Sequence, residues 1–280
     1  MILAPLLLFF VPAAESAEDI MARVAENQDR AEKMRSAFVY RQNVLVRINH
    51  TNGKLASEED IDYIVTPTEK GIKKERVRFL GKYVEHGKVI EYHEPRHPSV
   101  HVSLQSDMDH EITENFADDL TNDKKSKDGI DRNLFPLTAG EQKHYIFRLD
   151  GTEDYRGTPV YRILFEPNGK DDERPWAGEA LIDQKESQPV LVTTHLTFKM
   201  PVAVKVVLGT NIEHVGFKVT YKKFDEGLWF PVTYGGELKV RALFFYARRI
   251  GISMQNSGFA RAEVTSKVTY ESIREGAVTK

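Results

Sequence analysis

The first hydrophobic pattern after the N-terminal residues is helical. Between residues 17 and 36, apolar side chains recur every three or four positions, and charged side chains fill most of the others. The apolar positions are Ile20, Val24, Ala31 and Met34. Ser16 precedes the segment as a candidate N-cap, and Glu18 and Asp19 suit the positive end of a helix dipole. The pattern predicts an amphipathic helix that packs against a sheet.

After this helix the spacing of apolar residues changes to every second position. From residue 38 to residue 49, a largely apolar set of side chains alternates with a more polar set. The apolar set is Phe38, Tyr40, Gln42, Val44, Val46 and Ile48. Alternation of this kind predicts a long strand with one covered face, and Thr51-Asn52-Gly53 predicts the turn that follows it.

Strand patterns dominate the rest of the chain. We expect strands at residues 60–65, 76–80, 83–92, 145–150, 159–165, 178–183, 189–198, 213–224, 228–234, 238–250 and 262–273. Glycine-containing turn signals accompany them at residues 86–87, 150–151, 156–157, 168–169, 226–227, 235–236 and 257–258. Many strands without a βαβ rhythm predict a mainly β (α+β) fold, built as one large curved antiparallel sheet or a partial barrel.

Residues 106–137 interrupt this rhythm with a polar run of mixed charge. We expect a short helix around residues 112–120, followed by an exposed loop. A solvated insertion is the simplest interpretation, and a mobile lid is the alternative. Since no repeat or linker divides the remainder, we expect one domain over residues 18–280.

The N-terminus has the pattern of a secretory signal peptide. Residues 1–11 are almost entirely apolar, and the small residues Ala13, Ala14, Ser16 and Ala17 follow. The apolar stretch is shorter than the roughly 20 residues that a helix needs to cross a bilayer. We therefore expect residues 1–17 to be removed on export and the mature chain to lie free in the periplasm, with no transmembrane segment.

Composition and charge narrow the classes of function. The chain has 280 residues, of which 41% are hydrophobic and 29% are charged, as in ordinary globular proteins. A net charge of -3 offers no electrostatic case for a nucleic-acid partner. The absence of cysteine excludes disulfides, thiolate nucleophiles, cysteine-based zinc sites and an acylated-cysteine anchor.

One stretch matches a zinc-protease signature as a string of letters. His93-Glu94-Pro95-Arg96-His97 fits H-E-x-x-H, whose chemistry requires both histidines on one face of a helix and the glutamate as general base. A strand pattern precedes the motif, and Pro95 and Pro98 disfavour a helix there. A metal-dependent hydrolase that uses His93, Glu94 and His97 is therefore a remote alternative.

Other catalytic and ligand patterns are weak. A loop metal site could use His93, His97 and His101, although exposed loop histidines are the simpler interpretation. The acidic run at residues 118–123 lacks the spacing and central glycine of a calcium loop. No nucleophile elbow, Walker loop or dinucleotide-binding glycine motif occurs. The sequence predicts no catalytic residue, no metal site and no cofactor.

The remaining strong signals are apolar. Residues 198–208 form a long hydrophobic run, which is either a core strand or the wall of a groove for an apolar ligand. Residues 243–246 are apolar at every position, which in a strand suggests that a helix or a ligand covers the second face. Both runs favour binding over catalysis.

Taken together, these features resemble the outer-membrane lipoprotein carrier superfamily, the LolA/LolB-like proteins, and its uncharacterised exported members most of all. The resemblance rests on an N-terminal helix that leads into the long strand with Phe38, Tyr40 and Val44. It also rests on residues 176–183, similar to a G-x-x-x-I-D strand, and on residues 226–232, similar to a G-x-W-x-P strand. The last strand, near residue 273, completes a match that covers most of residues 18–280, while the insertion at 106–137 departs from the compact carriers.

The resemblance implies an unclosed β-barrel whose concave face is covered by helices and whose apolar cavity accepts acyl chains. The expected function is a non-enzymatic carrier or chaperone for a lipid or a lipidated protein. An envelope sensory or interaction module of the same fold, with a protein partner, is the alternative. From alternation and apolar runs, the candidate lining residues are Tyr40, Val44, Phe198, Met200, Val202, Val206, Trp229 and Phe244.

Overall fold

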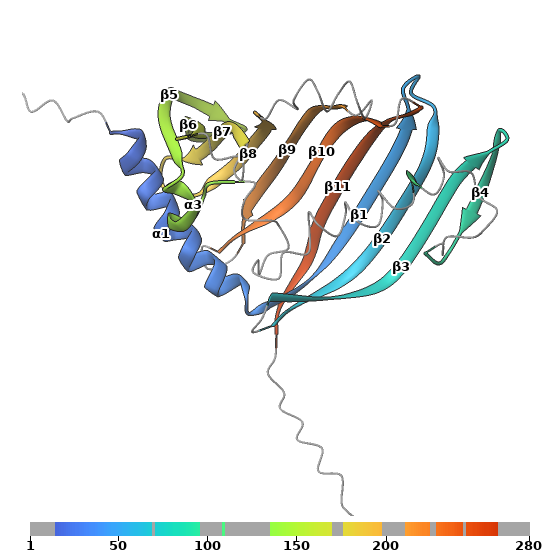
Figure 1. The fold of residues 1–280 in the computed structure, drawn as a ribbon. Coiled ribbons are helices and arrows are strands. Elements are labelled where there is room, and N and C mark those ends of the chain that lie inside the picture. The colour runs from blue at the N-terminus through green and yellow to red at the C-terminus, as the bar shows by residue number, and fades with distance from the viewer. Residues whose placement is uncertain are drawn as a thin grey trace, which may run out of the picture.

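The strands in the described part of this protein form one antiparallel sheet of 11 strands (Figure 1). The computed structural model describes residues 15–68, 71–95, 108–109, 135–169, 176–197, 211–224, 228–242 and 245–262, and only the backbone at 211–214. The helices are α1 (Ala17–Arg35) and α3 (Ala139–Gln142). The strands are β1 (Phe38–His50), β2 (Leu55–Thr68), β3 (Gly71–Glu85), β4 (Lys88–Tyr92), β5 (Tyr145–Tyr155), β6 (Thr158–Pro167), β7 (Trp176–Asp183), β8 (Pro189–Leu196), β9 (Asn211–Lys223), β10 (Trp229–Ala242) and β11 (Tyr246–Arg261).

The strand order is β4-β3-β2-β1-β11-β10-β9-β8-β7-β6-β5. The chain therefore builds outward from β1 to the edge at β4, continues at the opposite edge with β5, and returns strand by strand to β11 beside β1. In the described part of the chain, β4 and β5 are the two ends of this order and do not pair with each other. The expected mainly β fold, with a curved and unclosed antiparallel sheet, is confirmed.

The predicted N-terminal helix is present as α1. Ser16 has extended backbone angles, and its Oγ accepts a hydrogen bond from the Asp19 amide at 3.1 Å, as an N-cap does. Ile20, Val24 and Ala31 are buried as the pattern predicts, whereas Met34 is 38% exposed. The apolar face of α1 packs into the main hydrophobic cluster of the sheet.

Polar contacts fix α1 against the turn between β7 and β8. The Asn27 side-chain amide donates to the carbonyl oxygens of Glu186 and Ser187, at 2.9 and 3.1 Å. Gln28 Nε2 donates to Gln188 Oε1 at 2.7 Å, and both side chains are buried. The helix is therefore bound to the sheet by apolar burial along its length and by hydrogen bonds to one turn.

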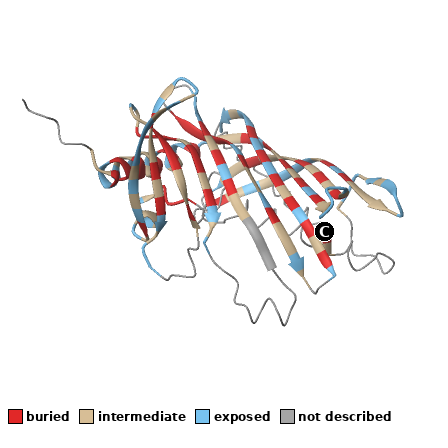
Figure 2. Ribbon diagram, turned by 90° about the horizontal axis from the view of Figure 1, so that it is seen from above, coloured by how far each residue is buried: buried red, intermediate tan, exposed pale blue. Residues whose placement is uncertain are grey.

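Burial alternates along the strands, and this alternation gives the sheet two different faces (Figure 2). We call the face that carries Tyr40, Gln42, Val44, Val46 and Ile48 of β1, and the residues in register with them, the inner face. All five are buried, and the cluster that contains Val44, Val46 and Ile48 also contains residues of α1. The opposite, outer face carries Arg41, Asn43, Leu45, Arg47 and Asn49, of which none is buried. The inner face is the concave side, which α1 covers in part.

Three of the predicted turns are wrong. The one at residues 150–151 lies inside β5, at a register shift against β6. Gly235 and Gly236, predicted as a turn, lie inside β10. A side chain would not fit at Gly236, because its Cβ would come within 2.2 Å of the Gly216 carbonyl oxygen. These glycines thus mark a close approach of strands and not a turn. Gly258, with φ of 62°, lies inside β11 next to a register shift against β1, as in a β-bulge. The chain reverses instead between Ala242 and Tyr246.

Other differences concern strand bounds. The predicted break between the strands at 76–80 and 83–92 is absent, because β3 runs without interruption from residue 71 to residue 85. Residues 245 and 246 belong to the turn after β10 and the start of β11, so the apolar run at 243–246 is not a two-sided strand. Residues 243–244, and the predicted strand at 263–273, lie outside the described residues.

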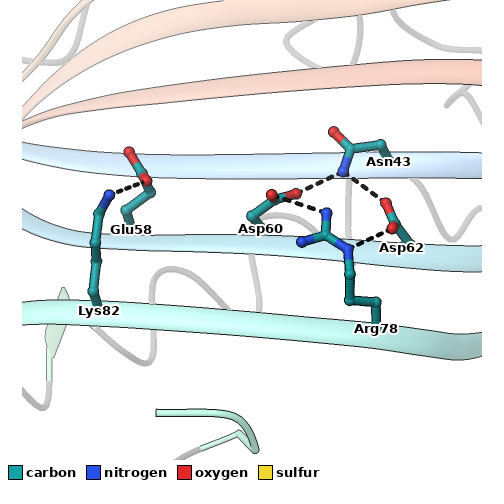
Figure 3. Close-up of polar contacts among 6 residues, drawn as sticks. All are labelled: Asn43, Glu58, Asp60, Asp62, Arg78 and Lys82. Atoms are coloured by element: carbon teal, nitrogen blue, oxygen red, sulfur yellow. Dashed lines mark hydrogen bonds and ion pairs between the residues drawn. The ribbon is translucent and has the colours of Figure 1, made fainter. Parts of the chain in front are cut away.

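Charged side chains on the outer face of β1–β3 form a paired network (Figure 3). Arg78 donates to Asp62 Oδ2 at 2.6 Å and to Asp60 Oδ2 at 2.9 Å, and Asn43 donates to both carboxylates. The hydrogen bond from Arg78, followed by that from Asn43, lowers the pKa of Asp62. Glu58 accepts from Lys82 at 2.6 Å and also from Arg47. Arg47, Arg78 and Lys82 are therefore each matched by carboxylates.

Candidate functional site

The inner face is the candidate functional site because apolar and aromatic side chains from most strands converge on it. Its main cluster combines residues of α1, β1, β2 and every strand from β5 to β11. On β10 and β9, the rings of Tyr234 and Phe217 stack with centroids 5.7 Å apart, and Trp176 of β7 meets Phe217 edge-on at 5.4 Å. The sheet thereby presents a continuous aromatic and aliphatic surface on its concave side.

The structure describes three of the eight predicted lining residues. Tyr40 and Val44 are buried on the inner face of β1, with Val65 and Met254 in register beside them. Trp229 is also buried, at the start of β10. Phe198, Met200, Val202, Val206 and Phe244 lie outside the described residues.

Trp229 anchors the C-terminal end of α1. Its indole N–H donates to Glu186 Oε2 at 3.0 Å, and its carbonyl oxygen accepts from Arg35 Nη1 at 2.9 Å. Glu186 also accepts from Lys223, and the hydrogen bonds from Lys223 and Trp229 lower the pKa of Glu186. Trp229 therefore connects the helix, the β7–β8 turn and β10, which is a different environment from that of Tyr40 and Val44.

A few polar side chains lie among the apolar residues of the inner face. Gln42 Nε2 donates to Asn256 Oδ1 at 3.1 Å, and Asn256 in turn donates to the Pro231 carbonyl oxygen at 3.0 Å. In the part of the chain that the structure describes, the buried Oε1 of Gln42 has no hydrogen-bond partner. Glu59 is buried nearby on β2 and accepts from the Tyr92 hydroxyl at 2.6 Å.

A buried ion pair ties the insertion to the inner face. Arg248 of β11 donates through Nε to Asp109 Oδ1 at 2.9 Å and through Nη2 to Asp109 Oδ2 at 3.2 Å. The two side chains are only 5% and 6% exposed. The Tyr246 hydroxyl also donates to Asp109, at 2.7 Å, and burial followed by the Asp109 charge raises the pKa of Tyr246.

This contact differs from the expectation of a solvated insertion at the few residues of the segment that the structure describes. Asp109 is buried, and Phe135 and Leu137 at the far end of the insertion are buried in the main cluster. Asp109 lies against the sheet because it forms the ion pair with Arg248, and Phe135 and Leu137 lie there because their apolar side chains leave water. The expected helix at 112–120 lies outside the described residues, so the interpretation as a lid stays a prediction.

Several side chains of the inner face are only partly buried. Tyr63, Val215 and Val240 pack against the main cluster but keep part of their surface exposed. Tyr63 is in register with Gln42, and its neighbour Ile64 is in register with Arg41 and therefore points to the outer face. Tyr63 and Ile64 thus offer a matched pair, because both are partly buried on the same strand but on opposite faces.

Sequence reasoning missed the polar members of this site. Gln42 and Glu59 could have been found, because each is a polar residue at an inner-facing position of an alternating strand. Asp109 could not have been distinguished from the other acidic residues of the insertion, since its partner Arg248 is 139 positions away.

No metal or catalytic cluster emerges from the described residues. Within them, no group of three or more His, Asp or Glu residues could hold a metal ion. His93 and Glu94 lie in a bend directly after β4, so they lack the helical geometry that H-E-x-x-H requires, and His97 is outside the described residues. Among the described helices, none has the length and hydropathy required to cross a membrane.

Comparison with known proteins yields similar solved structures. No protein family and no curated protein matches the sequence. A DUF1329 family protein from Desulfovibrio piger is 12% identical with a TM-score of 0.36, over 92% of this chain and 98% of that one. A LolA superfamily protein from Nitrosomonas europaea is 11% identical with a TM-score of 0.36, over 91% of this chain and 97% of that one. The superfamily that the sequence resembles is thus represented among the similar structures, and the site described above rests on this chain's own residues.

Proposed function

We propose that this protein is a non-enzymatic carrier or binding protein that holds the acyl chain of a lipid or lipidated protein against the inner face. The observation that carries the proposal is the convergence of apolar side chains from α1 and most strands on one concave face, in a sheet whose edges do not pair. Edges that do not pair are compatible with entry of a chain-like ligand from the open side of the sheet.

The energetics suit an acyl chain. Each methylene group removed from water contributes about 0.8 kcal/mol, so burying eight of them contributes about 6 kcal/mol. Apolar burial needs no catalytic group, and partly buried side chains such as Tyr63, Val215 and Val240 supply surface that a ligand can still cover.

The proposed location is the periplasm, after export directed by the apolar N-terminal segment. We place the cleavage after Ala14, because Glu15 and Ser16 have roles in the fold. Glu15 accepts from Arg23 at 2.5 Å and from the Tyr161 hydroxyl at 2.8 Å, and Ser16 caps α1. A cut after Ala17 would remove both contacts.

Replacement of Tyr63 by serine tests the proposed binding face. Removing a ring that contacts the ligand with part of its surface is expected to weaken binding of a fluorescent fatty acid roughly tenfold. The matched control is Ile64→Ser, which removes a similarly buried side chain from the outer face of the same strand. The measurement is a fluorescence titration of native protein and both variants.

Two outcomes would contradict the proposal. Native protein that does not bind the fatty acid at micromolar concentration has no acyl-binding face. Equal losses in Tyr63→Ser and Ile64→Ser would mean that binding does not depend on the inner face. In either case, an interaction module that binds protein becomes the better account of this fold.

A further inference from the structure

The hairpin of β10 and β11 carries a hollow on the outer face that is lined by positive side chains. This hollow has a volume of about 280 Å³, and its lining includes Thr51, Lys239, Arg241, Arg248 and Arg249. We call Lys239, Arg241 and Arg249 the hairpin cations. A second hollow of about 490 Å³ adjoins the first, because Arg249 lines both, and it continues over Gly235 and Gly251.

The register places like charges directly opposite each other. Lys239 of β10 pairs with Arg249 of β11, and Arg241 follows Lys239 by two positions on the same face. Like charges opposite each other across two antiparallel strands destabilise a sheet. An arrangement of this kind is stabilised when an anion lies between the cations.

The hairpin cations lack internal partners. In the described part of the chain, none of the three forms an ion pair or a hydrogen bond, whereas Arg248 is neutralised by Asp109. The outer-face cations Arg78 and Lys82 are paired with carboxylates (Figure 3), and Arg47 is paired with Glu58. The hairpin cations thus differ from Arg47, Arg78 and Lys82 in having no carboxylate partner among the described residues, and they lie side by side in the register.

Two acidic residues lie close to the hairpin cations in the sheet. Glu237 precedes Lys239 by two positions and lines the second hollow, but in the described structure it forms no ion pair with the hairpin cations. Glu213 of β9 is the other register neighbour of Lys239. Besides Val240 and Ala247, the first hollow is lined by cations and the Thr51 hydroxyl, and Glu237 is not among its lining residues.

An exposed aromatic side chain lies at the end of the same hairpin. Phe245 is 48% exposed and precedes Tyr246, the first residue of β11. Exposed aromatic residues next to lysine and arginine are the combination that proteins use at membrane surfaces, where rings enter the headgroup region and cations contact lipid phosphates. Free phosphate would use the cations but would not cover the exposed surface of Phe245.

We propose that this hairpin docks on a membrane surface, with the hairpin cations and Thr51 holding the phosphate of an anionic phospholipid and Phe245 entering the headgroup region. The overall charge of -3 does not prevent this, because charges beyond about 8–10 Å are screened at physiological salt. The site lies on the outer face, so it is independent of the proposed binding of acyl chains by the inner face.

Vesicle co-sedimentation tests the proposal with the full chain. Vesicles of phosphatidylcholine alone are compared with vesicles that contain phosphatidylglycerol, each at low and high sodium chloride. Binding is expected only with phosphatidylglycerol, weaker at high salt, and reduced at least tenfold in the triple variant Lys239→Ala, Arg241→Ala, Arg249→Ala, since one cation near such a surface contributes about fivefold. Glu237→Gln is expected to strengthen binding.

The control variant is Lys88→Ala, which removes one exposed cation at the far edge of the sheet in β4. It is expected to bind like the native chain.

The triple variant is expected to unfold at the same or a higher denaturant concentration, because it removes repulsion between the hairpin cations. The exposed Arg241→Gln change gives a second variant should the triple one misfold. The proposal is overturned if native protein binds both vesicles equally or not at all, if the triple variant binds as well as native protein, or if inorganic phosphate binds to the hairpin while vesicles do not.

Discussion

Replacing Asp109 by alanine is expected to lower the free energy of unfolding by about 3–5 kcal/mol, because it leaves the buried Arg248 without its partner. A guanidinium that is 5% exposed cannot regain water without local opening of the structure. Arg248 would also lose the charge-assisted hydrogen bonds to both carboxylate oxygens of Asp109. The measurement is equilibrium unfolding in urea, followed by circular dichroism.

Two further variants show whether burial causes the loss. Arg47→Ala breaks the pair with Glu58 on the outer face, where Arg47 is 52% exposed, and should change stability by less than about 1 kcal/mol. The double variant Asp109→Leu, Arg248→Met replaces the buried pair by apolar groups and should recover most of the loss. A loss in Asp109→Ala no larger than in Arg47→Ala would mean that the insertion is not held against β11 by this contact.

Replacing Ile20 by alanine is expected to cost about 2–5 kcal/mol, the usual range for truncating a fully buried aliphatic side chain. Ile20 is a residue of α1 whose side chain is completely buried, in the same cluster as Val44, Val46 and Ile48 of the sheet. The change leaves the exposed side of the helix intact and removes contacts only where α1 covers the inner face. It therefore measures how strongly α1 is attached to the sheet.

Met34→Ala is the matched control on the same helix. Met34 was expected on the buried face but is 38% exposed, so its truncation should change stability by no more than about 0.5 kcal/mol. Urea unfolding of both variants provides the comparison. Equal effects at Ile20 and Met34 would mean that α1 is not packed on the inner face as described.

The parts of the fold that follow from local pattern were predictable from sequence. The helix over 17–35 has its cap, its charges and its apolar face within one segment, and the strand at 38–50 has strict alternation. Gly235 and Gly236 were misread as a turn because a glycine pair has two possible causes. Only the neighbouring strands show that close packing requires them: Gly216 and Phe217 of β9 lie against Gly236, and the Ile252 carbonyl oxygen of β11 lies against Gly235.

The long-range parts of the site were not predictable. The order of strands places β1 beside β11 across more than 200 positions, and only this pairing brings Val44 next to Met254. Lys239 and Arg249 oppose each other only because the hairpin turns after residue 242, which the apolar run at 243–246 concealed. A net charge near zero likewise concealed a local cluster of unpaired cations.

Photo-crosslinking with a fatty acid that carries a diazirine near its methyl end tests the central claim most directly. After irradiation, digestion and mass spectrometry of the labelled peptides would locate the bound chain. The account predicts labels on inner-face residues, among them Tyr63, Val215 and Val240, and competition by unlabelled fatty acid. Labels confined to outer-face residues such as Leu45 and Ile64, or labelling that unlabelled fatty acid does not compete away, would contradict it.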